Sequence, residues 1–205
     1  MANEDGVPRE FFHLIYKSGA SELPWDIARA QPEVERLVAA GELRGRVLDV
    51  GCGPGDNAIA VARGGASVLA IDHVPAAVEL ARKRARAAGV PIELAVADAL
   101  DLGALGRRFD AALDSGTFHT LSDANRPRYA ASLAAVLEPG AALHLLCFSD
   151  AEPGTAGPRR VTEAELRAAF DAPRFHVASV ERARFATRNP TGGAAALRAR
   201  VVRLG

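Results

Sequence analysis

Short apolar runs alternate along the chain with segments whose apolar residues recur at helical spacing, and this pattern predicts the secondary structure. The apolar runs end on aspartate or glycine, which favour turns, and an amphipathic segment follows most of them. Such alternation is typical of an α/β sheet with helices on both faces. The strands expected in this part of the chain are 46–50, 67–71, 92–97, 109–113 and 141–148.

Local end signals give the expected helix boundaries. Proline at a first helical position and glycine after the last predict a helix over 75–88, which ends at Gly89. Asp123 is expected to cap a helix whose apolar stripe includes Leu137, and 139–140 should end it. Further helices are expected from Pro32, from Ala58 to about Gly64, and from a Thr162/Glu165 capping box to Phe170.

The two ends of the chain carry different patterns. Strands over 175–185 and 197–204 flank the turn-forming segment 189–193, which predicts a closing antiparallel pair. The first residues are polar, whereas the next twenty or so are rich in aromatic side chains. The expected single domain therefore consists of a disordered tail at 1–10, an aromatic-rich segment at 11–31 and a core at 32–205.

Composition narrows the class of protein. A chain of 205 residues with 49% apolar and 24% charged residues is suited to one globular domain with a sizeable core. Acidic and basic residues balance at 25 each, so no overall field favours nucleic acid or a membrane as a partner. The run 141–148 is too short to span a membrane, 1–10 does not resemble a secretion signal, and the two cysteines indicate reduced intracellular thiols. We expect a cytoplasmic protein, a monomer or homodimer, without nucleic-acid or membrane partners.

The segment 46–57 carries the strongest chemical signal. An apolar strand breaks into Gly51, Gly53 and Gly55, and a helix begins at once. Glycine there allows positive φ and lets a ligand approach backbone N–H groups. A dinucleotide fingerprint requires glycine where Asp56 stands, and the Lys-Ser/Thr of a phosphate loop is absent. The turn is therefore expected to bind a ligand without phosphates.

This stretch resembles motif I of the class I S-adenosylmethionine-dependent methyltransferases, hydrophobic-Asp-hydrophobic-Gly-x-Gly-x-Gly. The resemblance covers about 47–148. It implies a Rossmann-like seven-stranded sheet whose last strand is antiparallel. It also implies S-adenosylmethionine as cofactor and S-adenosylhomocysteine as product.

Four expected strands carry an aspartate at or near the edge where ligands bind in α/β sheets: Asp49, Asp72, Asp98 and Asp114. Asp72 can accept from both ribose hydroxyls, Asp98 can meet the adenine amine, and Asp114 can face the sulfonium or the amino-acid end. Aspartates also end strands simply because they form turns, so that alternative stays open. The expected cofactor-binding set is Trp25, Asp49, Gly51, Cys52, Gly53, Gly55, Asn57, Asp72, His73, Asp98, Ala99 and Asp114.

The methyl acceptor is expected to be a small aromatic or heterocyclic molecule. Methyltransferases that act on DNA bases or protein amides carry Asp/Asn-Pro-Pro-aromatic where this chain has 114–119, which lacks the prolines. The segment 23–32 resembles an N-terminal element of the thiopurine and halide/thiol methyltransferases and of related actinobacterial enzymes, although Ala28 and Ala30 depart from its pattern. The resemblance makes 11–31 a helical lid, with Trp25 against the cofactor.

Methyl transfer is an in-line displacement, so alignment and exclusion of water can supply much of the rate. His119 is the first candidate for a general base where one is needed, and His13 is the second. No metal-ligand cluster is recognisable. The residues expected to line the acceptor site are Phe12, Tyr16, Phe118, His119, Phe148, Asp150 and Arg159.

The predicted activity is transfer of a methyl group from S-adenosylmethionine to an O, N or S atom of such a molecule. Two alternatives remain at this stage. One is a cofactor-binding or adaptor protein without turnover. The other is an NAD-dependent oxidoreductase, which would share Asp72 and the strand-turn-helix but lacks the glycine at position 56 and leaves the other edge aspartates unexplained.

Overall fold

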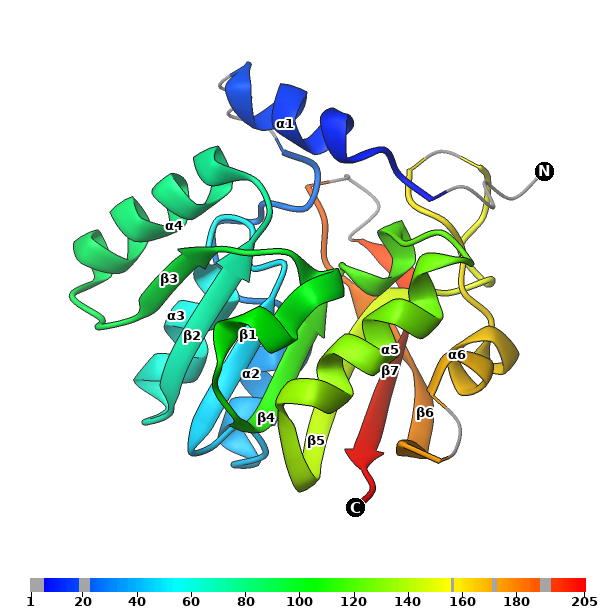
Figure 1. Ribbon diagram of the computed structural model, residues 1–205. Coiled ribbons are helices and arrows are strands. Elements are labelled where there is room, and N and C mark those ends of the chain that lie inside the picture. Colours follow the sequence, from blue (N-terminus) through cyan, green and yellow to red (C-terminus); the bar gives the residue numbers. More distant parts are fainter. Residues whose placement is uncertain (1–5, 19–22, 156, 171–172, 189–192) are drawn as a thin grey trace.

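The computed structural model describes residues 6–18, 23–155, 157–170, 173–188 and 193–205. Its strands are β1 Arg46–Val50, β2 Ser67–Asp72, β3 Glu93–Val96, β4 Phe109–Ser115, β5 Leu137–Phe148, β6 Phe175–Phe185 and β7 Ala194–Arg203. They form one seven-stranded sheet in the order β3-β2-β1-β4-β5-β7-β6 (Figure 1). The first five strands are parallel, and β7 runs antiparallel to both β5 and β6. The predicted sheet with an antiparallel last strand is confirmed.

Helices cover both faces of this sheet, with α5 in front of the strands and α2 behind them in Figure 1. The helices of one face pack through Val34, Ala58 and Ala81, and those of the other through Leu102 and Tyr129. The first group is α2 Pro32–Ala39, α3 Asp56–Arg63 and α4 Pro75–Ala88. The second group is η1 Ala99–Leu105, η2 Phe118–Thr120, α5 Asn125–Val136 and α6 Glu163–Phe170.

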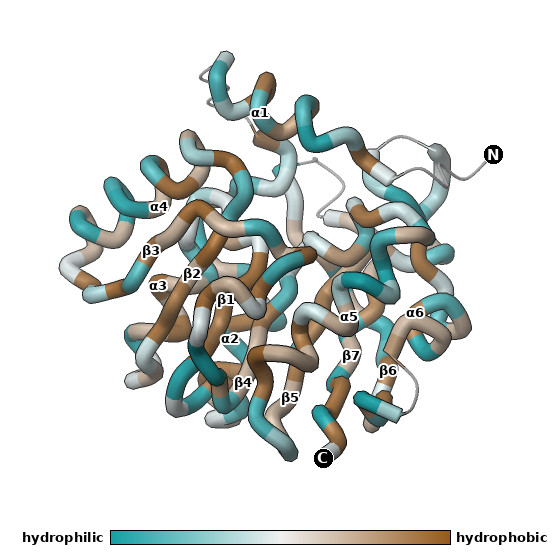
Figure 2. The backbone as a smooth tube through the Cα atoms, viewed as in Figure 1, coloured by the Kyte–Doolittle hydropathy of each residue, from teal (hydrophilic) through white to brown (hydrophobic). Residues whose placement is uncertain are grey.

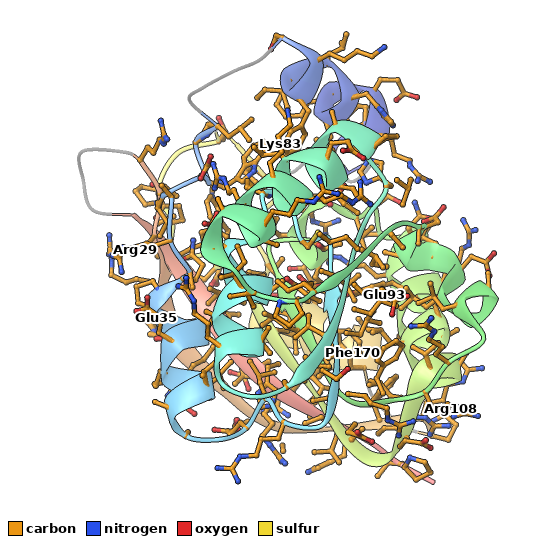
Figure 3. The ribbon with its side chains drawn as sticks, turned by 90° about the vertical axis from the view of Figure 1, so that its left-hand side faces the viewer. Arg29, Glu35, Lys83, Glu93, Arg108 and Phe170 are labelled. Atoms are coloured by element: carbon orange, nitrogen blue, oxygen red, sulfur yellow. The ribbon has the colours of Figure 1, made fainter. Side chains whose placement is uncertain are left out.

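The central strands are mostly apolar because both of their faces are covered. Val47 and Leu48 are each 0% exposed, yet they belong to the cores on opposite sides of the sheet. Burying such a side chain contributes about 1.5–3 kcal/mol. Figure 2 shows the hydrophobic colour concentrated on the strands, and Figure 3 shows Phe170 in the interior, whereas Lys83 lies exposed on α4.

Several sequence-based boundaries are confirmed. Strands Arg46–Val50 and Phe175–Phe185 and helix Pro75–Ala88 match the prediction, and Gly89 ends that helix with φ of 65°. The capping box is also present, since the backbone N of Glu165 donates to Thr162 Oγ1 at 3.1 Å and the N of Thr162 donates to Glu165 Oε2 at 2.8 Å. The segment 189–192, most of the predicted connection between the last strands, lies outside the described residues.

The helix α5 differs from the prediction at both ends. It stops at Val136, and Leu137 already pairs with Phe109 as the first residue of β5. A proline disfavours helical backbone angles at the residue before it, so Pro139 ends α5 earlier than the apolar stripe of the helix indicated. At the start, Asp123 does not cap the helix but binds Arg159 Nη1 at 2.5 Å.

The first helix begins earlier than predicted. Residues 1–5 lie outside the described residues, but α1 Arg9–Lys17 begins inside the segment expected to be disordered. The backbone N of Val7 donates to the carbonyl of Thr120 at 2.8 Å, which ties the start of α1 to η2. In Figure 1 α1 lies across the edge of the sheet at which the parallel strands end. The predicted lid segment therefore contains a helix above that edge, and its action as a lid stays a prediction.

Candidate functional site

The glycine turn after β1 needs glycine both for its backbone angles and for its close packing against Thr117. Gly51 and Gly55 adopt φ of 69° and 89°, which favours glycine. A Cβ on Gly51 would lie 2.0 Å from Thr117 Oγ1, and that hydroxyl donates to the carbonyl of Val50 at 2.8 Å. A side chain at residue 51 would thus displace the β4–η2 connection. The turn after β1 and the turn after β4 form one packed unit.

Asp72, at the end of β2, joins the glycine turn to the next helix. Its Oδ2 accepts from the backbone N of Gly53 at 3.0 Å, and its Oδ1 accepts from the N of Val74 at 2.9 Å. The residue is 8% exposed, and burial raises the pKa of its carboxyl against these hydrogen bonds. Each oxygen has a further lone pair that can accept a hydrogen bond. Asp72 therefore fixes the shape of the turn and still offers acceptors to a ligand.

Asp49 and Asp114 lie deeper than the other predicted carboxylates, and they differ in their partners. Asp114 is 0% exposed and accepts from Tyr129 Oη at 2.7 Å, from the N of Thr117 at 2.8 Å and from the N of Phe118 at 3.1 Å. Its predicted cofactor contact is wrong, because the carboxylate is used to build the turn after β4. Asp49 is 2% exposed, and its buried Oδ2 has no hydrogen-bond partner among the described residues.

Replacing Asp49 with asparagine should change the pH dependence of stability in the cofactor-free protein. Burial, then the nearby Asp114 and Asp72, raise the pKa of Asp49 to about 7. The folded state therefore holds a proton that the unfolded chain has released, and stability falls as pH rises from about 4 to about 7. Asparagine at this position does not titrate, so the Asp49→Asn variant should not show this fall in stability. The difference in free energy of unfolding between the variant and wild type should therefore rise by more than about 1 kcal/mol from about pH 4 to about pH 7.

Urea unfolding at a series of pH values measures this difference. Asp101→Asn, which changes an exposed aspartate on η1, is the control. A difference between Asp49→Asn and wild type that stays flat across the range would contradict the assignment of a protonated Asp49.

The lid places a group of aromatic side chains over the glycine turn. Tyr16 Oη would lie 3.1 Å from a Cβ on Gly53, and Trp25 Nε1 is 3.4 Å from the same hydroxyl. Phe12 packs on Trp25, with ring centroids 6.0 Å apart, and on His73, at 5.8 Å. His13 also meets the His73 ring, at 5.5 Å. The sequence-predicted Trp25, Phe12 and Tyr16 are thus brought together above the turn.

An arginine on α4 holds the second half of the lid. Arg84 Nη2 binds Asp26 Oδ2 at 2.6 Å, and its Nη1 binds both Asp26 and Asp56. Burial raises the pKa of Asp26, but the bonds from Arg84 outweigh it and leave the pKa below its ordinary value. Asp56, which stands where a dinucleotide fingerprint requires glycine, is thus paired with Arg84.

Gln31 and Asn57 continue this attachment of the lid. The backbone N of Gln31 donates to Asn57 Oδ1 at 2.9 Å, so Asn57, predicted to contact the cofactor, holds the lid with its side-chain oxygen. The Gln31 amide also exchanges hydrogen bonds of 2.8 and 2.9 Å with the backbone of Ala186, beyond β6. The end of the lid is therefore fixed to α3, α4 and the β6 end at once.

Arg84→Met should loosen the lid while keeping the packing of the arginine stem. Asp26 is 7% exposed and would lose its charged partner next to Trp25. We expect a loss of about 1–2 kcal/mol of stability and about a tenfold weaker binding of the ligand under the lid, since Arg84 is itself partly exposed. Arg86→Met, on the exposed side of the same helix, is the control. Equal ligand affinity in both variants would exclude this role.

A second aromatic group lies beyond the turn after β4. His119 packs against Phe148 and Phe185, with ring centroids 4.9 and 5.9 Å apart, and these two phenylalanines are 5.4 Å from each other. A Cβ on Gly116 would lie 3.2 Å from Phe185 and 3.5 Å from His119 Nε2. The predicted pair His119 and Phe148 is thus joined by Phe185 from β6.

The His119 imidazole is a poor general base. Burial, with smaller contributions from Arg160 and Arg126, lowers its pKa to about 3. Its Nδ1 already accepts a hydrogen bond of 3.0 Å from the backbone N of Phe148. The prediction of His119 as a base is therefore not supported, because a ring that binds protons this weakly does not remove one from an ordinary acceptor at neutral pH.

Other predicted acceptor residues lie elsewhere than expected. Phe118 is 0% exposed and belongs to the core with Tyr129, so its predicted substrate contact is wrong. The Arg159 guanidinium binds Asp123 at 2.5 Å and also binds Glu165, and its side chain is only 8% exposed. It is a structural link and does not face an anionic substrate.

Asp98 and Asp150 lie at the edge that the sequence indicates. Asp98 is partly exposed, accepts from the backbone N of Leu100 at 2.9 Å, and binds Arg9 Nη1 of α1 at 2.7 Å. The neighbouring Ala99 begins η1. Asp150 is exposed in the loop after β5. An ion pair from the lid helix therefore reaches the carboxylate predicted to meet adenine.

Comparison with known proteins decides the family. A methyltransferase domain model matches residues 47–140. A 2-heptyl-1-hydroxyquinolin-4(1H)-one methyltransferase of Mycobacteroides abscessus is 33% identical over 167 residues, which cover 78% of this chain and 74% of that protein. This chain belongs to the S-adenosylmethionine-dependent methyltransferases. The NAD-dependent alternative is therefore wrong.

Two further proteins resemble this methyltransferase over most of its length. A probable thiol methyltransferase 2 of Arabidopsis thaliana is 26% identical over 169 residues, covering 77% of this chain and 75% of that protein. A solved structure from work on the conversion of a disulfide bond into a thioacetal group during echinomycin biosynthesis is 31% identical. It superposes with a TM-score of 0.86 and covers 96% of this chain and 93% of the other.

The residues of the site fit the cofactor of this family. The cofactor carries a cationic amino group and a sulfonium, and the edge offers the orphaned Asp49 Oδ2 and the open lone pairs of Asp72. Gly51, Gly53 and Gly55 place no side chains in the turn, Cys52 between them is buried, and Asp56 beside them is paired with Arg84. Within the described ranges no group of three or more His, Cys, Asp or Glu could hold a metal ion.

Arg84, Gln31 and Phe185 are the site residues that the sequence did not reveal. Arg84 lies in a run of basic residues on α4 that looks like a solvated face. Phe185 reaches the methyltransferase site only because β6 pairs with β7, which brings its end beside β5. The sequence around Gln31 or Phe185 does not indicate which distant residue each side chain contacts.

Proposed function

We propose that this methyltransferase acts on an O, N or S atom of a small aromatic or heterocyclic molecule, with an N-hydroxyquinolone as the first candidate. The observation that carries the proposal is that two aromatic groups come together at one edge of the sheet, where Trp25 and Phe148 pack against one small cluster that contains Phe185. The lid group covers Gly53, the second group borders Gly116, and Gly51 packs on Thr117 between them. The likeness to the hydroxyquinolone enzyme supports the same class of acceptor.

In this proposal the cofactor lies along the edge from Asp98 to Asp49. Asp98 and Ala99 bind the adenine, Asp72 binds the ribose, and Asp49 with the glycine turn binds the amino-acid end. Trp25, Tyr16 and His73 close over it from the lid side, where aromatic faces also stabilise a cation. When bound, S-adenosylmethionine supplies a methyl group on a sulfonium, whose carbon accepts a lone pair of the acceptor while the C–S electrons return to sulfur.

The chain's own residues contribute alignment and exclusion of water. Phe12, Phe148 and Phe185 offer flat apolar faces that can hold an aromatic ring in one orientation. His13, half-buried on α1, is the remaining candidate for a proton acceptor near the lid. Asp150, in the exposed loop after β5, is proposed to border the entrance.

The test is formation of S-adenosylhomocysteine, measured by mass spectrometry, with a panel of acceptors. The panel contains 1-hydroxyquinolin-4(1H)-one, 8-hydroxyquinoline, thiophenol and iodide. Turnover of a hydroxyquinoline or thiophenol at the highest kcat/KM supports the proposal. Tight binding of S-adenosylmethionine in calorimetry without product from any acceptor would favour a binding or adaptor protein instead.

The remaining expectations concern the cellular setting. Cys52 and Cys147 are both buried free thiols, which supports the cytoplasm as the proposed location. We keep the proposal of a single domain that works as a monomer or homodimer without nucleic-acid partners. Among the described residues no helix is both long and apolar enough to cross a membrane.

A further inference from the structure

The hydrogen bond from Phe148 to His119 sets the tautomer of this buried ring. A backbone N–H can only donate, so the Nδ1 that accepts from it at 3.0 Å carries a lone pair. A neutral imidazole with a lone pair on Nδ1 carries its proton on Nε2. The ring is 4% exposed and is held in place by Phe148 and Phe185, so its orientation is fixed as well.

The Nε2–H of this tautomer has no use within the described part of the chain. Nε2 forms no hydrogen bond to the described residues. It is also not one of the buried polar atoms that lack a partner, so it remains accessible to solvent. It faces the Gly116 turn, where the absent Cβ would lie 3.5 Å away. An oriented donor in a nine-tenths buried, aromatic surrounding is a polar anchor of the kind that small-molecule sites use.

We infer that His119 selects the methyl acceptor as a hydrogen-bond donor through Nε2–H, and that its partner is a ring carbonyl or ring oxyanion. This inference rests on the proposed function and deepens it. In an ionised N-hydroxyquinolone the negative charge is shared with the ring oxygen, so a donor at that oxygen aligns the ring and stabilises its anion. The proton of the N-hydroxy group leaves to solvent when the acceptor ionises, and His119 keeps its own.

The charges around the ring agree with a donor. Arg160 lies over the Phe148 ring, 5.6 Å from its centroid, and Arg126 lies over Phe118, at 4.8 Å. Both cations oppose protonation of His119 and favour an acceptor that brings negative charge. A thiol such as thiophenol has no ring oxygen besides its reacting sulfur, so it offers Nε2–H no separate acceptor.

Two substitutions separate the roles that His119 could have. Glutamine places an amide N–H near the position of Nε2 but loses the acceptor for Phe148, whereas asparagine keeps that acceptor and has nothing at the Nε2 position. Neither side chain is a base. The kinetics of His119→Gln and His119→Asn are measured with 1-hydroxyquinolin-4(1H)-one and with thiophenol, and affinity for S-adenosylmethionine and Tm report folding.

For a donor, His119→Asn should lower kcat/KM for the hydroxyquinolone about 10- to 100-fold, mainly through KM, and should leave thiophenol within about threefold. His119→Gln should retain most of the hydroxyquinolone activity. Equal losses in both variants, with a wild-type kcat that falls as pH drops through one ionisation, would establish a base. Better activity in His119→Asn than in His119→Gln would reduce His119 to a structural role.

Two measurements keep the inference distinguishable from the proposed function. Long-range ¹H–¹⁵N spectra of the histidine rings read the tautomer directly, and a proton on Nδ1 or a charged ring at neutral pH would overturn the inference. If wild type turns over neither acceptor, the proposed function fails. Calorimetry of 1-hydroxyquinolin-4(1H)-one with S-adenosylhomocysteine present then compares the two variants, and equal affinities would overturn the donor role as well.

Discussion

Asp72→Ala is expected to weaken the binding of S-adenosylmethionine about 100-fold or more, the largest effect of any single change to the carboxylate edge. The alanine removes the acceptors proposed for the ribose. It also leaves the backbone N–H groups of Gly53 and Val74 without their partner, at 3.0 and 2.9 Å in the native turn. Unpaired buried donors cost about 1–3 kcal/mol each, so the glycine turn should change shape before the cofactor arrives.

Calorimetric titration with S-adenosylmethionine and with S-adenosylhomocysteine measures this loss. Asp72→Asn separates the two contributions, because its amide oxygen can keep one of the backbone bonds while the negative charge is lost. Asp101→Ala, on the exposed side of η1, controls for removal of an aspartate near the same edge. Affinity of Asp72→Ala within about threefold of wild type would remove Asp72 from the cofactor site.

The parts of the fold that depend on neighbours in sequence were predictable. The glycine turn, the strand Arg46–Val50 and the helix Pro75–Ala88 follow from apolar runs, glycines and prolines that act within a few residues. The capping box at Thr162 has the same local origin. Because parallel strands end at one edge, the aspartates after them could be placed there without knowing their partners.

The parts that depend on tertiary partners were not predictable. Asp49 and Asp114 look alike in the sequence, yet Tyr129 and two backbone N–H groups satisfy one, and the other keeps an orphaned oxygen. His119 has the position of a base, but the donor from Phe148 and its burial make it a weak one. Such differences arise from which groups the folded chain brings into contact.

The lid has one property that the sequence predicted and one that it did not. Its aromatic content and its resemblance to related enzymes predicted that it covers the site, and α1 does lie above the edge. Its attachment through Arg84 and Gln31 joins residues 58 and 155 positions apart in the chain, and no local pattern encodes such contacts. The sequence therefore indicated where the lid closes but not what holds it.

Gly55→Ala should destabilise the protein by about 2–5 kcal/mol, because two costs add at this position. Gly55 is the N-cap of α3 and has φ of 89°, a conformation that costs an L-residue about 1–2 kcal/mol. A Cβ there would also lie 2.8 Å from the Cβ of Ala81, which is 0% exposed on α4, and overpacking of this kind costs about 1–3 kcal/mol more. Urea unfolding of the cofactor-free protein measures the sum.

Gly89→Ala is the matched control for the backbone cost. Gly89 has φ of 65°, and nothing lies within 4 Å of a Cβ placed there, so this variant should lose only about 1–2 kcal/mol. In the double variant Gly55→Ala/Ala81→Gly the clash is removed, and the interaction energy between the two sites should recover about 1–3 kcal/mol. Equal losses for Gly55→Ala and Gly89→Ala, with no coupling to residue 81, would show that α4 yields to the added methyl group. Contact between the glycine turn and α4 would then not fix the position of the cofactor site.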